Sequence, residues 1–275
     1  MKIAHLLLWL VICSALHSYG QSSHVPVSYA YTGIGAYSQH SVDAFSFLSN
    51  QAALAQLKSA EAGVFAEKRF LLDELSAYTA AVALPTASGN FGLKTNYYGN
   101  ADYNESVIGL AYGRNLGDKM DVGVQFNYNR ILAAGYGSAN VISAEVGTII
   151  HVSKQLNTGI HINNPVAMKY GKNNDEKLPS VYSFGIGYEP SDKALLNMEI
   201  IKQEDEPVNI NAGFQYKPAD QVFVRAGIST ATSRVWLGAG LLWKNFRIDV
   251  MSSYHSQLGL SPGVLFLMNF KKKRE

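Results

Sequence analysis

The chain is poor in cysteine and, after its first residues, in long apolar runs. Its single cysteine, Cys13, lies in an amino-terminal stretch that joins Lys2 to an apolar run and then to small residues. Residues 1–20 therefore predict a secretory signal peptide that is cleaved before Gln21. A lipoprotein signal ending at Cys13 is the alternative, and bulky Ile12 stands where such a signal needs a small residue. Without Cys13 the exported chain has neither disulfide nor thiol chemistry.

Charge is scarce as well. Asp, Glu, Lys and Arg make up 16% of the 275 residues and the net charge is +2, whereas tyrosine (16) and glycine (24) are abundant. Soluble domains usually carry about a quarter charged residues, and a near-neutral chain offers no basic surface for nucleic acid. After the signal peptide, no segment reaches the roughly twenty apolar residues that a membrane-spanning helix requires. The composition therefore favours a barrel in lipid over a soluble enzyme.

Alternation of apolar and polar residues is the main pattern that remains. In residues 121–129, Val122, Val124, Phe126 and Tyr128 fall on one face, and polar residues with one glycine fall on the other. A β-strand turns successive side chains to opposite faces, so this segment has one apolar and one polar surface. The same pattern recurs in four further segments, residues 143–152, 180–189, 221–229 and 264–270.

About fourteen such segments, each about fifteen residues long with its turn, follow residue 61, and this length suits a tilted transmembrane strand. An even number of strands can close on itself, which removes the sheet edges that lipid cannot satisfy. The predicted fold is an all-β, antiparallel outer-membrane β-barrel over residues 62–275. A soluble propeller or sandwich is the alternative, but its outward faces would be rich in charge, whereas the polar faces here are mainly Gly, Asn, Ser and Thr.

The connections give a second test of this fold. If the chain enters the barrel from the periplasm, every second turn should be short and the others free to lengthen. The predicted periplasmic turns are all tight, at residues 85–90, 115–119, 154–157, 189–193, 217–221 and 244–246. The outward connections include residues 132–140 and the long segment 163–180, which we expect to be the docking surface for a partner because loops of this length are usually functional or disordered.

One stretch ahead of the first strand, residues 41–57, has helical rather than strand periodicity. Phe45, Leu48, Ala52 and Leu57 roughly follow the spacing of one helix face. We interpret residues 21–61 as a short helical plug that folds into the periplasmic mouth of the barrel. A mobile periplasmic tether is the alternative.

Catalytic motifs are missing from the sequence. It contains no nucleophile elbow, no H-E-x-x-H sequence and no phosphate-binding loop, so we expect neither an enzyme nor a cofactor. If residues 154–157 form the turn, His151 and His161 face one another inside the barrel, close enough to share a metal with Glu145. Hydrated lumen histidines are the alternative, and the prediction is that no metal is bound.

Charged residues on the inner faces of the last strands predict a network. Arg247 and Asp249 are two positions apart on one inner face, and Arg225 faces inward two strands away. We expect these groups, with Glu145, His151 and His161, to form lumen charge clusters. The Arg247 network should bridge the wall or pin the plug, and a substrate filter is the alternative.

The plug region resembles the amino-terminal signature of the outer-membrane barrels related to the fatty-acid transporter FadL, especially the branch that contains PorV and PorQ of type IX secretion. The matching residues are Gly33, Gly35, Ala36, Asp43, Ala44, Asn50, Ala52, Ala53 and Leu54. Gln51 departs from the pattern, since the family usually has proline there. The resemblance implies a fourteen-stranded barrel with an amino-terminal segment inside it, in which Gly33, Gly35, Asp43, Asn50, Ala52 and Leu54 build the plug.

Two functions follow from these expectations. In the first, the chain is a non-enzymatic barrel in the outer membrane of a Gram-negative bacterium, surrounded by lipid and attached to a larger outer-membrane complex or a secreted protein of a type IX-like machine. In the second, it is a FadL-like channel for small hydrophobic molecules. The short chain and brief outer loops favour the accessory role in protein transport. Nucleic acid is not an expected partner.

Overall fold

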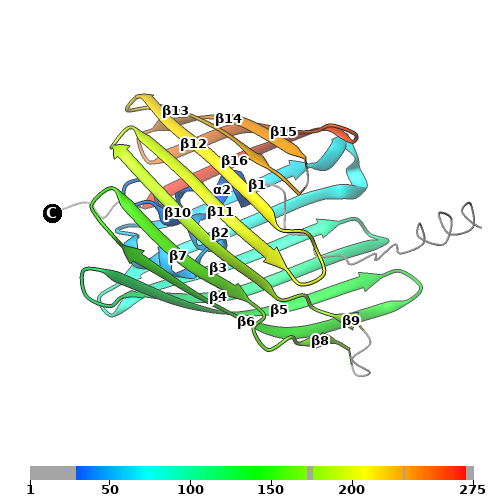
Figure 1. Cartoon of the computed structure of the whole chain (residues 1–275). Coiled ribbons are helices and arrows are strands. Elements are labelled where there is room, and N and C mark those ends of the chain that lie inside the picture. The colour runs from blue at the N-terminus through cyan, green and yellow to red at the C-terminus, as the bar shows by residue number, and fades with distance from the viewer. Residues whose placement is uncertain (1–28, 172–175, 232, 271–275) are drawn as a thin grey trace, which may run out of the picture.

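The computed structural model describes residues 29–171, 176–231 and 233–270, and fourteen of its strands close into a single antiparallel barrel (Figure 1). The predicted signal peptide lies outside the described residues. Each barrel strand pairs with its neighbours along the chain, and β1 closes the ring by pairing with β16. The predicted fold and strand number are confirmed. The barrel strands are β1 (Ala60–Lys68), β2 (Ser76–Thr86), β3 (Gly89–Gly99), β4 (Tyr103–Asn115), β5 (Met120–Ala133), β6 (Gly137–His151), β7 (Leu156–Asn163), β10 (Val181–Ser191), β11 (Ala194–Gln203), β12 (Asn209–Ala219), β13 (Val222–Ser229), β14 (Arg234–Trp243), β15 (Phe246–His255) and β16 (Gly259–Phe270).

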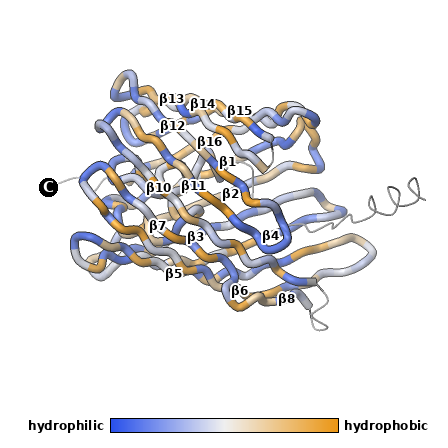
Figure 2. The backbone as a smooth tube through the Cα atoms, viewed as in Figure 1, coloured by the Kyte–Doolittle hydropathy of each residue, from blue (hydrophilic) through white to orange (hydrophobic). Residues whose placement is uncertain are grey.

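The alternating sequence pattern sets which side of each strand faces the lumen. In β5, Gln125 and Asn127 are buried in the barrel, whereas Phe126 between them is 62% exposed on the outer surface. The same alternation runs along the strands in Figure 2 as a change between polar and apolar colours. Because the exposed outer side chains are large and apolar, the outside of this barrel suits hydrocarbon rather than water.

The connections are short at one end of the barrel. There β10 is joined to β11 through residues 192–193, and β14 to β15 through residues 244–245. We assign this end to the periplasm, because periplasmic turns of such barrels are the short ones. At the other end the longest connection, residues 164–180, carries the small sheet of β8 (Lys169–Tyr170) and β9 (Glu176–Lys177). The predicted outward loop 132–140 is shorter than expected, since β5 and β6 extend into it.

The plug is a series of short helical turns inside the barrel rather than one helix. It comprises α2 (Tyr29–Thr32) and the 3₁₀ turns η1 (Gly33–Tyr37), η2 (Ser46–Leu48) and η3 (Gln51–Gln56). The predicted helical element over residues 41–57 is therefore broken, and the break falls at Asn50. Its backbone is extended at φ −153°, and its side-chain oxygen accepts the N–H of Ala52. A short amide side chain competes with backbone helix bonding in this way.

Two further short 3₁₀ turns, η4 (Arg69–Leu71) and η5 (Asp73–Leu75), lie between β1 and β2. No helix in the described part of the chain is both long and apolar enough to cross a membrane.

Apolar plug side chains form the core of the molecule. Phe45, Phe47 and Leu54 are almost completely buried in the lumen, where they belong to one cluster with Phe65 and Leu265 of the wall. The wall approaches the plug backbone closely where glycines replace side chains. A Cβ atom on Gly123 would lie 2.3 Å from the carbonyl carbon of Gln51. Missing side chains in the wall thus make room for the plug.

Candidate functional site

A buried ion-pair cluster joins the plug to the wall at the periplasmic half of the lumen. Arg247 on β15 donates from Nη1 to Asp43 Oδ2 of the plug at 2.6 Å. It also donates from Nε and Nη2 to the two oxygens of Asp249, at 2.8 and 2.6 Å. The three side chains are buried. Asp43 lies 204 positions before Arg247 in the sequence, so this contact attaches the plug to one of the last two strands of the barrel.

Arg225 on β13 completes this Asp43 cluster, which comprises Asp43, Arg225, Arg247 and Asp249. Its Nε donates to Gln215 at 2.8 Å and its Nη1 donates to the carbonyl of Tyr31 at 3.2 Å, while Nη2 stays 4.0 Å from Asp43. The Tyr31 hydroxyl donates to Asp249 at 3.3 Å. Burial raises the pKa of Tyr31, so its hydroxyl keeps the proton that it donates.

The remaining oxygen of Asp43 organises the plug itself. Asp43 Oδ1 accepts the backbone N–H groups of Phe45 and Ser46 at 2.8 and 3.1 Å. One carboxylate therefore caps a turn of the plug and pairs with the wall at the same time. Removing one member of a buried ion pair leaves its partner uncompensated, which typically costs about 3–5 kcal/mol. The Asp43 cluster attaches the plug to the wall through a buried ion pair.

A second cluster surrounds Glu145 of β6 in the middle of the lumen. Glu145 Oε1 lies 3.1 Å from Lys94 Nζ, and Glu145 Oε2 lies 2.9 Å from His161 Nε2. Gln125 and Asn127 of β5 donate to the same carboxylate at 2.8 and 2.6 Å. Gln51 of the plug also donates to it through Nε2. The carboxylate is thus satisfied by charge and by hydrogen bonds, as a buried charge requires.

His151 does not belong to this cluster. In the ladder between β6 and β7, His161 lies opposite Gly147, whereas His151 lies opposite Asn157. The prediction that the two histidines face one another is wrong, because the hairpin turns through residues 152–155 instead of 154–157. Within the described part of the chain, no group of three or more His, Cys, Asp or Glu side chains is arranged to hold a metal ion.

His151 instead forms a third cluster with Asp121. Its Nε2 lies 2.8 Å from Asp121 Oδ2, and its Nδ1 lies 2.8 Å from the side-chain oxygen of Asn157. Two plug residues close this cluster: Gln56 donates to Asp121 at 2.7 Å and Gln39 donates to Asn157 at 3.0 Å. The roles of Asp121, Lys94, Gln39 and Gln56 were not predicted from the sequence, although alternation along residues 121–129 places Asp121 on the inward face.

The other predicted plug residues lie at tight backbone contacts. Gly33 and Gly35 leave no room for a Cβ atom, which would lie 1.9 Å from Ser49 Oγ and 2.2 Å from the carbonyl oxygen of Ser41, respectively. Asn50 donates from Nδ2 to the carbonyls of Thr148 and Ile160, both at 3.2 Å.

Ala52 and Leu54 are buried in η3 and face the wall. Every predicted plug residue therefore lies inside the barrel and contacts the wall or another part of the plug.

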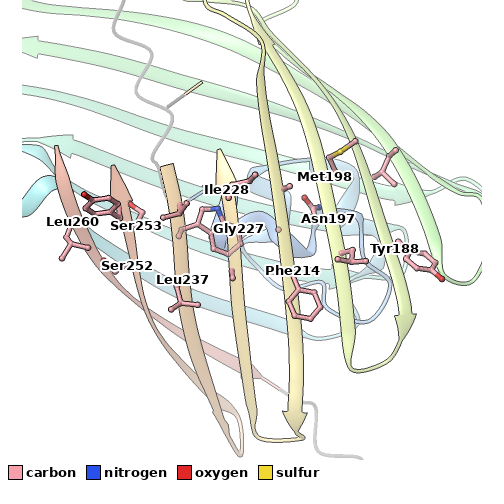
Figure 3. A pocket seen from close by; sticks show the side chains of 18 residues that line it. Tyr188, Asn197, Met198, Phe214, Gly227, Ile228, Leu237, Ser252, Ser253 and Leu260 are labelled. Carbon is pink, nitrogen blue, oxygen red and sulfur yellow. The ribbon is translucent and has the colours of Figure 1, made fainter. Parts of the chain in front are cut away.

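An apolar hollow lies on the outer surface of the wall, across β10 to β16 (Figure 3). Its volume is about 870 Å³, and large outward side chains such as Met198, Phe214 and Leu237 surround it. It exists because the outward residues between them are small, as at Ala212 and Ala226. We call this feature the wall hollow.

The wall is thin beneath the wall hollow. Gly213 of β12 and Gly227 of β13 are direct partners in the ladder, so two neighbouring inward positions carry no side chain. The Trp236 indole lies behind them on the lumen side, 2.2 Å from where a Gly227 Cβ would stand. The ring then packs edge-on against Tyr31 of the plug, with 5.7 Å between centroids. A continuous apolar layer thus links the membrane side of the wall to the plug.

Comparison with known proteins identifies the fold. No family model matches the chain, and no curated protein matches it in sequence. Among solved structures, the CymD monoaromatic hydrocarbon channel is similar with a TM-score of 0.64 and 13% identity, covering 90% of this chain and 97% of that one. The toluene transporter TodX of Pseudomonas putida gives a TM-score of 0.59 at 10% identity, covering 86% and 97%. A FadL homologue of Pseudomonas aeruginosa gives 0.56 at 12% identity, covering 83% and 93%.

The protein has the fold of a Gram-negative outer-membrane channel. The likeness to the CymD channel covers 90% of this chain. It supports the outer membrane as the location and agrees with the apolar exterior of the barrel.

Proposed function

We propose that the protein is a non-enzymatic outer-membrane channel for small hydrophobic molecules that enter from the membrane at the wall hollow. The observation that carries this proposal is the wall hollow itself, an apolar space of about 870 Å³ above a glycine pair with the plug directly behind it. A hydrophobic solute enters the bilayer because each Å² of apolar surface that leaves water contributes about 25 cal/mol, and from the bilayer it meets only an apolar lining at the wall hollow. Two proteins of similar structure, a monoaromatic hydrocarbon channel and a toluene transporter, support the same class of solute.

The lumen gives the plug a part in this function. Its polar faces and three charge clusters do not suit a hydrophobic solute, whereas the Trp236–Tyr31 contact offers an apolar route to the plug. Movement of the plug away from Trp236 would open space behind the glycine pair. The proposed cycle is therefore binding in the wall hollow, displacement of Trp236 and Tyr31, and release along the plug.

Filling the wall hollow tests the proposal. Ala226→Leu adds an apolar side chain to its floor, and Ala80→Leu makes the same change on the outward face of β2, away from the hollow. Intact Gram-negative host cells that express each variant are exposed to N-phenyl-1-naphthylamine, whose fluorescence rises when it passes the outer surface of the cell and enters phospholipid. We expect wild type and Ala80→Leu to take up the probe at the same rate and Ala226→Leu several-fold more slowly. Equal rates in all three proteins would contradict the proposal.

Binding can be measured apart from passage. Of the three tryptophans, Trp9 lies in the predicted signal peptide, so a mature Trp243→Phe protein keeps Trp236 as its only indole. Bromobenzene added to this protein in lipid nanodiscs should quench Trp236 fluorescence, and the added Ala226→Leu change should weaken the quenching. Equal quenching with and without Ala226→Leu would show that the solute binds outside the wall hollow.

An accessory role in secretion, as in the PorV and PorQ branch, is the second candidate. The packing of the lumen favours it, because Tyr31, Phe45 and Phe47 of the plug are buried against the wall. The outer connection between β7 and β10 also contains folded structure, which we call the platform. Within it Asn164 donates to the Leu178 carbonyl at 2.6 Å, and Lys177 pairs with Glu204 of the next outer connection at 2.6 Å. On this proposal the platform receives a larger outer-membrane complex or a secreted protein.

A pull-down separates the two candidates. Membranes are solubilised gently and the tagged barrel is recovered, with Lys177→Glu as a variant that reverses one charge of the platform. Stoichiometric recovery of a large partner with wild type, and its loss with Lys177→Glu, would support the accessory role. Recovery of the barrel alone would leave the channel as the function.

A further inference from the structure

A second cavity opens between the plug and the periplasmic ends of β12 to β16. Its volume is about 190 Å³, roughly the space of six waters at about 30 Å³ each. Plug residues from His40 to Asp43 form one side, and Lys217, Lys244 and Asn269 form part of the other. Since Lys217 lies near the end of β12 and Lys244 lies in the short turn between β14 and β15, this vestibule cavity faces the periplasm. It is separate from the wall hollow and does not depend on passage of a hydrophobic solute.

Positive charge exceeds negative charge in its lining. The cationic side chains are those of Lys217, Arg225, Lys244 and Arg247, and the acidic ones are those of Asp43 and Glu61. His40 also lines the cavity, and its ring lies 3.3 Å from Glu189.

The acidic groups are already occupied. Asp43 accepts from Arg247 and from two plug N–H groups. Glu61 accepts the N–H of Ala44 at 2.9 Å and the side-chain amide of Asn269 at 2.7 Å. The carboxylate oxygens in the lining are thus satisfied from within the protein.

The cationic groups retain donors. Across residues 29–171, 176–231 and 233–270, the half-buried Lys217 ammonium forms no hydrogen bond or ion pair, and burying an ammonium without a partner is costly. The nearest carboxylate to Arg225 Nη2 in these ranges is Asp43, at 4.0 Å. Lys244 occupies the left-handed region at φ +55°, where glycine is normally preferred. Its ammonium lies 5.4 Å from the Trp243 ring.

We propose that the vestibule cavity binds the carboxylate of a small organic acid from the periplasm. Lys217 supplies the main charge contact and Arg225 Nη2 supplies a second donor. Lys244 adds a positive charge at the rim of the cavity. The Lys217 ammonium has no direct ion pair among the described residues, and it lies beside a guanidinium with a free donor, so together they match a carboxylate, which accepts hydrogen bonds through both oxygens. The volume restricts the ligand to a short acid, or to the head of a longer one that extends outward.

Fluorine NMR with trifluoroacetate as the probe tests this site on the full barrel in detergent micelles. We expect wild-type protein to broaden the probe signal, acetate to reverse the broadening, and acetamide, which has the same shape without the charge, to leave it unchanged. Lys217→Gln should weaken binding by about tenfold or more, since a hydrogen bond to a charged group contributes about 1.5–3 kcal/mol. The matched control is Lys154→Gln, which removes a lysine from another periplasmic turn that does not line the cavity and should bind as wild type.

Three results would overturn the proposal. The first is no broadening with wild type, and the second is equal weakening by Lys217→Gln and Lys154→Gln, which would indicate only a general attraction to the basic rim. The third is displacement by inorganic phosphate but not by acetate, which would make the ligand a phosphate and not a carboxylate. Heat-modified migration of each variant in electrophoresis confirms that the barrel has folded.

Discussion

Asp43 is the residue on which the position of the plug depends most, because its two oxygens serve two structures at once. Oδ1 caps a plug turn and Oδ2 pairs with Arg247. Asp43→Asn keeps an oxygen for the cap but removes the charge, leaving two buried guanidinium groups with Asp249 as their nearby acid. The loss is expected to destabilise the seated plug by about 3 kcal/mol.

Conductance in planar bilayers measures the effect of Asp43→Asn. We expect the variant to open more often and to conduct several-fold more current than wild type. Asp73→Asn serves as the control, since Asp73 pairs with Lys68 in an exposed loop, where ion pairs contribute little. Wild-type conductance in Asp43→Asn would show that the ion pair does not hold the plug.

Gln51 shows why one residue departs from the FadL-like signature that the plug region resembles. Proline is normal there, and the extended backbone of Asn50 would accept it. Gln51 instead donates to Glu145, which no proline side chain can do. We expect Gln51→Pro to keep the barrel intact but loosen η3 by about 1.5–3 kcal/mol, the range for a hydrogen bond to a charged group.

Hydrogen exchange of the Ala52–Gln56 amides is the measurement for Gln51→Pro. Faster exchange in these amides alone is the expected result. Gln51→Glu is the companion variant, because a second carboxylate beside Glu145 should loosen η3 more than proline does. Exchange as slow as in wild type for both variants would contradict the role given to Gln51.

At the scale of the elements, the glycine contacts between wall and plug are open to test. Gly123→Ala would place a Cβ atom against the backbone of Gln51 and Ala52, which cannot move without moving η3. Gly92→Ala, the control, would meet only the flexible side chains of Leu54 and Phe47, at 3.1 Å or more. Protease cleavage within the plug should rise in Gly123→Ala and stay low in Gly92→Ala. Equally low cleavage in both variants would mean that η3 does not depend on close contact with the wall at Gly123.

The strands could be predicted because a period of two is a local property of the sequence. In β5, for example, apolar Val124 is exposed on the lipid side and polar Gln125 is buried on the lumen side, as the alternation predicts. The plug was harder, since its apolar residues repeat roughly as in a helix, whereas the Asn50 side chain breaks the backbone into 3₁₀ turns. Helical spacing reports which residues are buried more reliably than it reports the type of turn.

Contacts between strands depend on the register, which sequence alone fixes poorly. Moving the β6–β7 turn by two residues was enough to separate His151 from His161. The inward position of Arg225, Arg247 and Asp249 followed from alternation, but the choice of Asp43 as their partner did not, because charge pairing over such a sequence distance leaves no local signal. The wall hollow could not be predicted from the sequence for the same reason, since it depends on small residues that are neighbours only in the folded sheet.

At the scale of the whole molecule, the barrel has two surfaces that face different environments, lipid outside and the plug inside. The outer surface is apolar and belongs in hydrocarbon. The inner wall carries charged and polar residues that pair with the plug, together with apolar residues such as Phe65 and Leu265 that pack against it. This division explains how a chain with only 16% charged residues folds around a charged interior. It also separates the two proposed binding sites, since the wall hollow meets the membrane and the vestibule cavity meets the periplasm.

Spin labels along β5 in liposomes test this division most directly. The mature chain lacks cysteine if the predicted signal peptide is removed, so single cysteines at successive positions from Val122 to Asn129 can each carry one label. The account predicts high collision rates with oxygen, which dissolves in lipid, at the even-numbered positions and low rates at the odd-numbered ones. Uniform rates along the strand, or access to a water-soluble nickel complex at the even-numbered positions, would contradict a lipid-facing wall around a filled lumen.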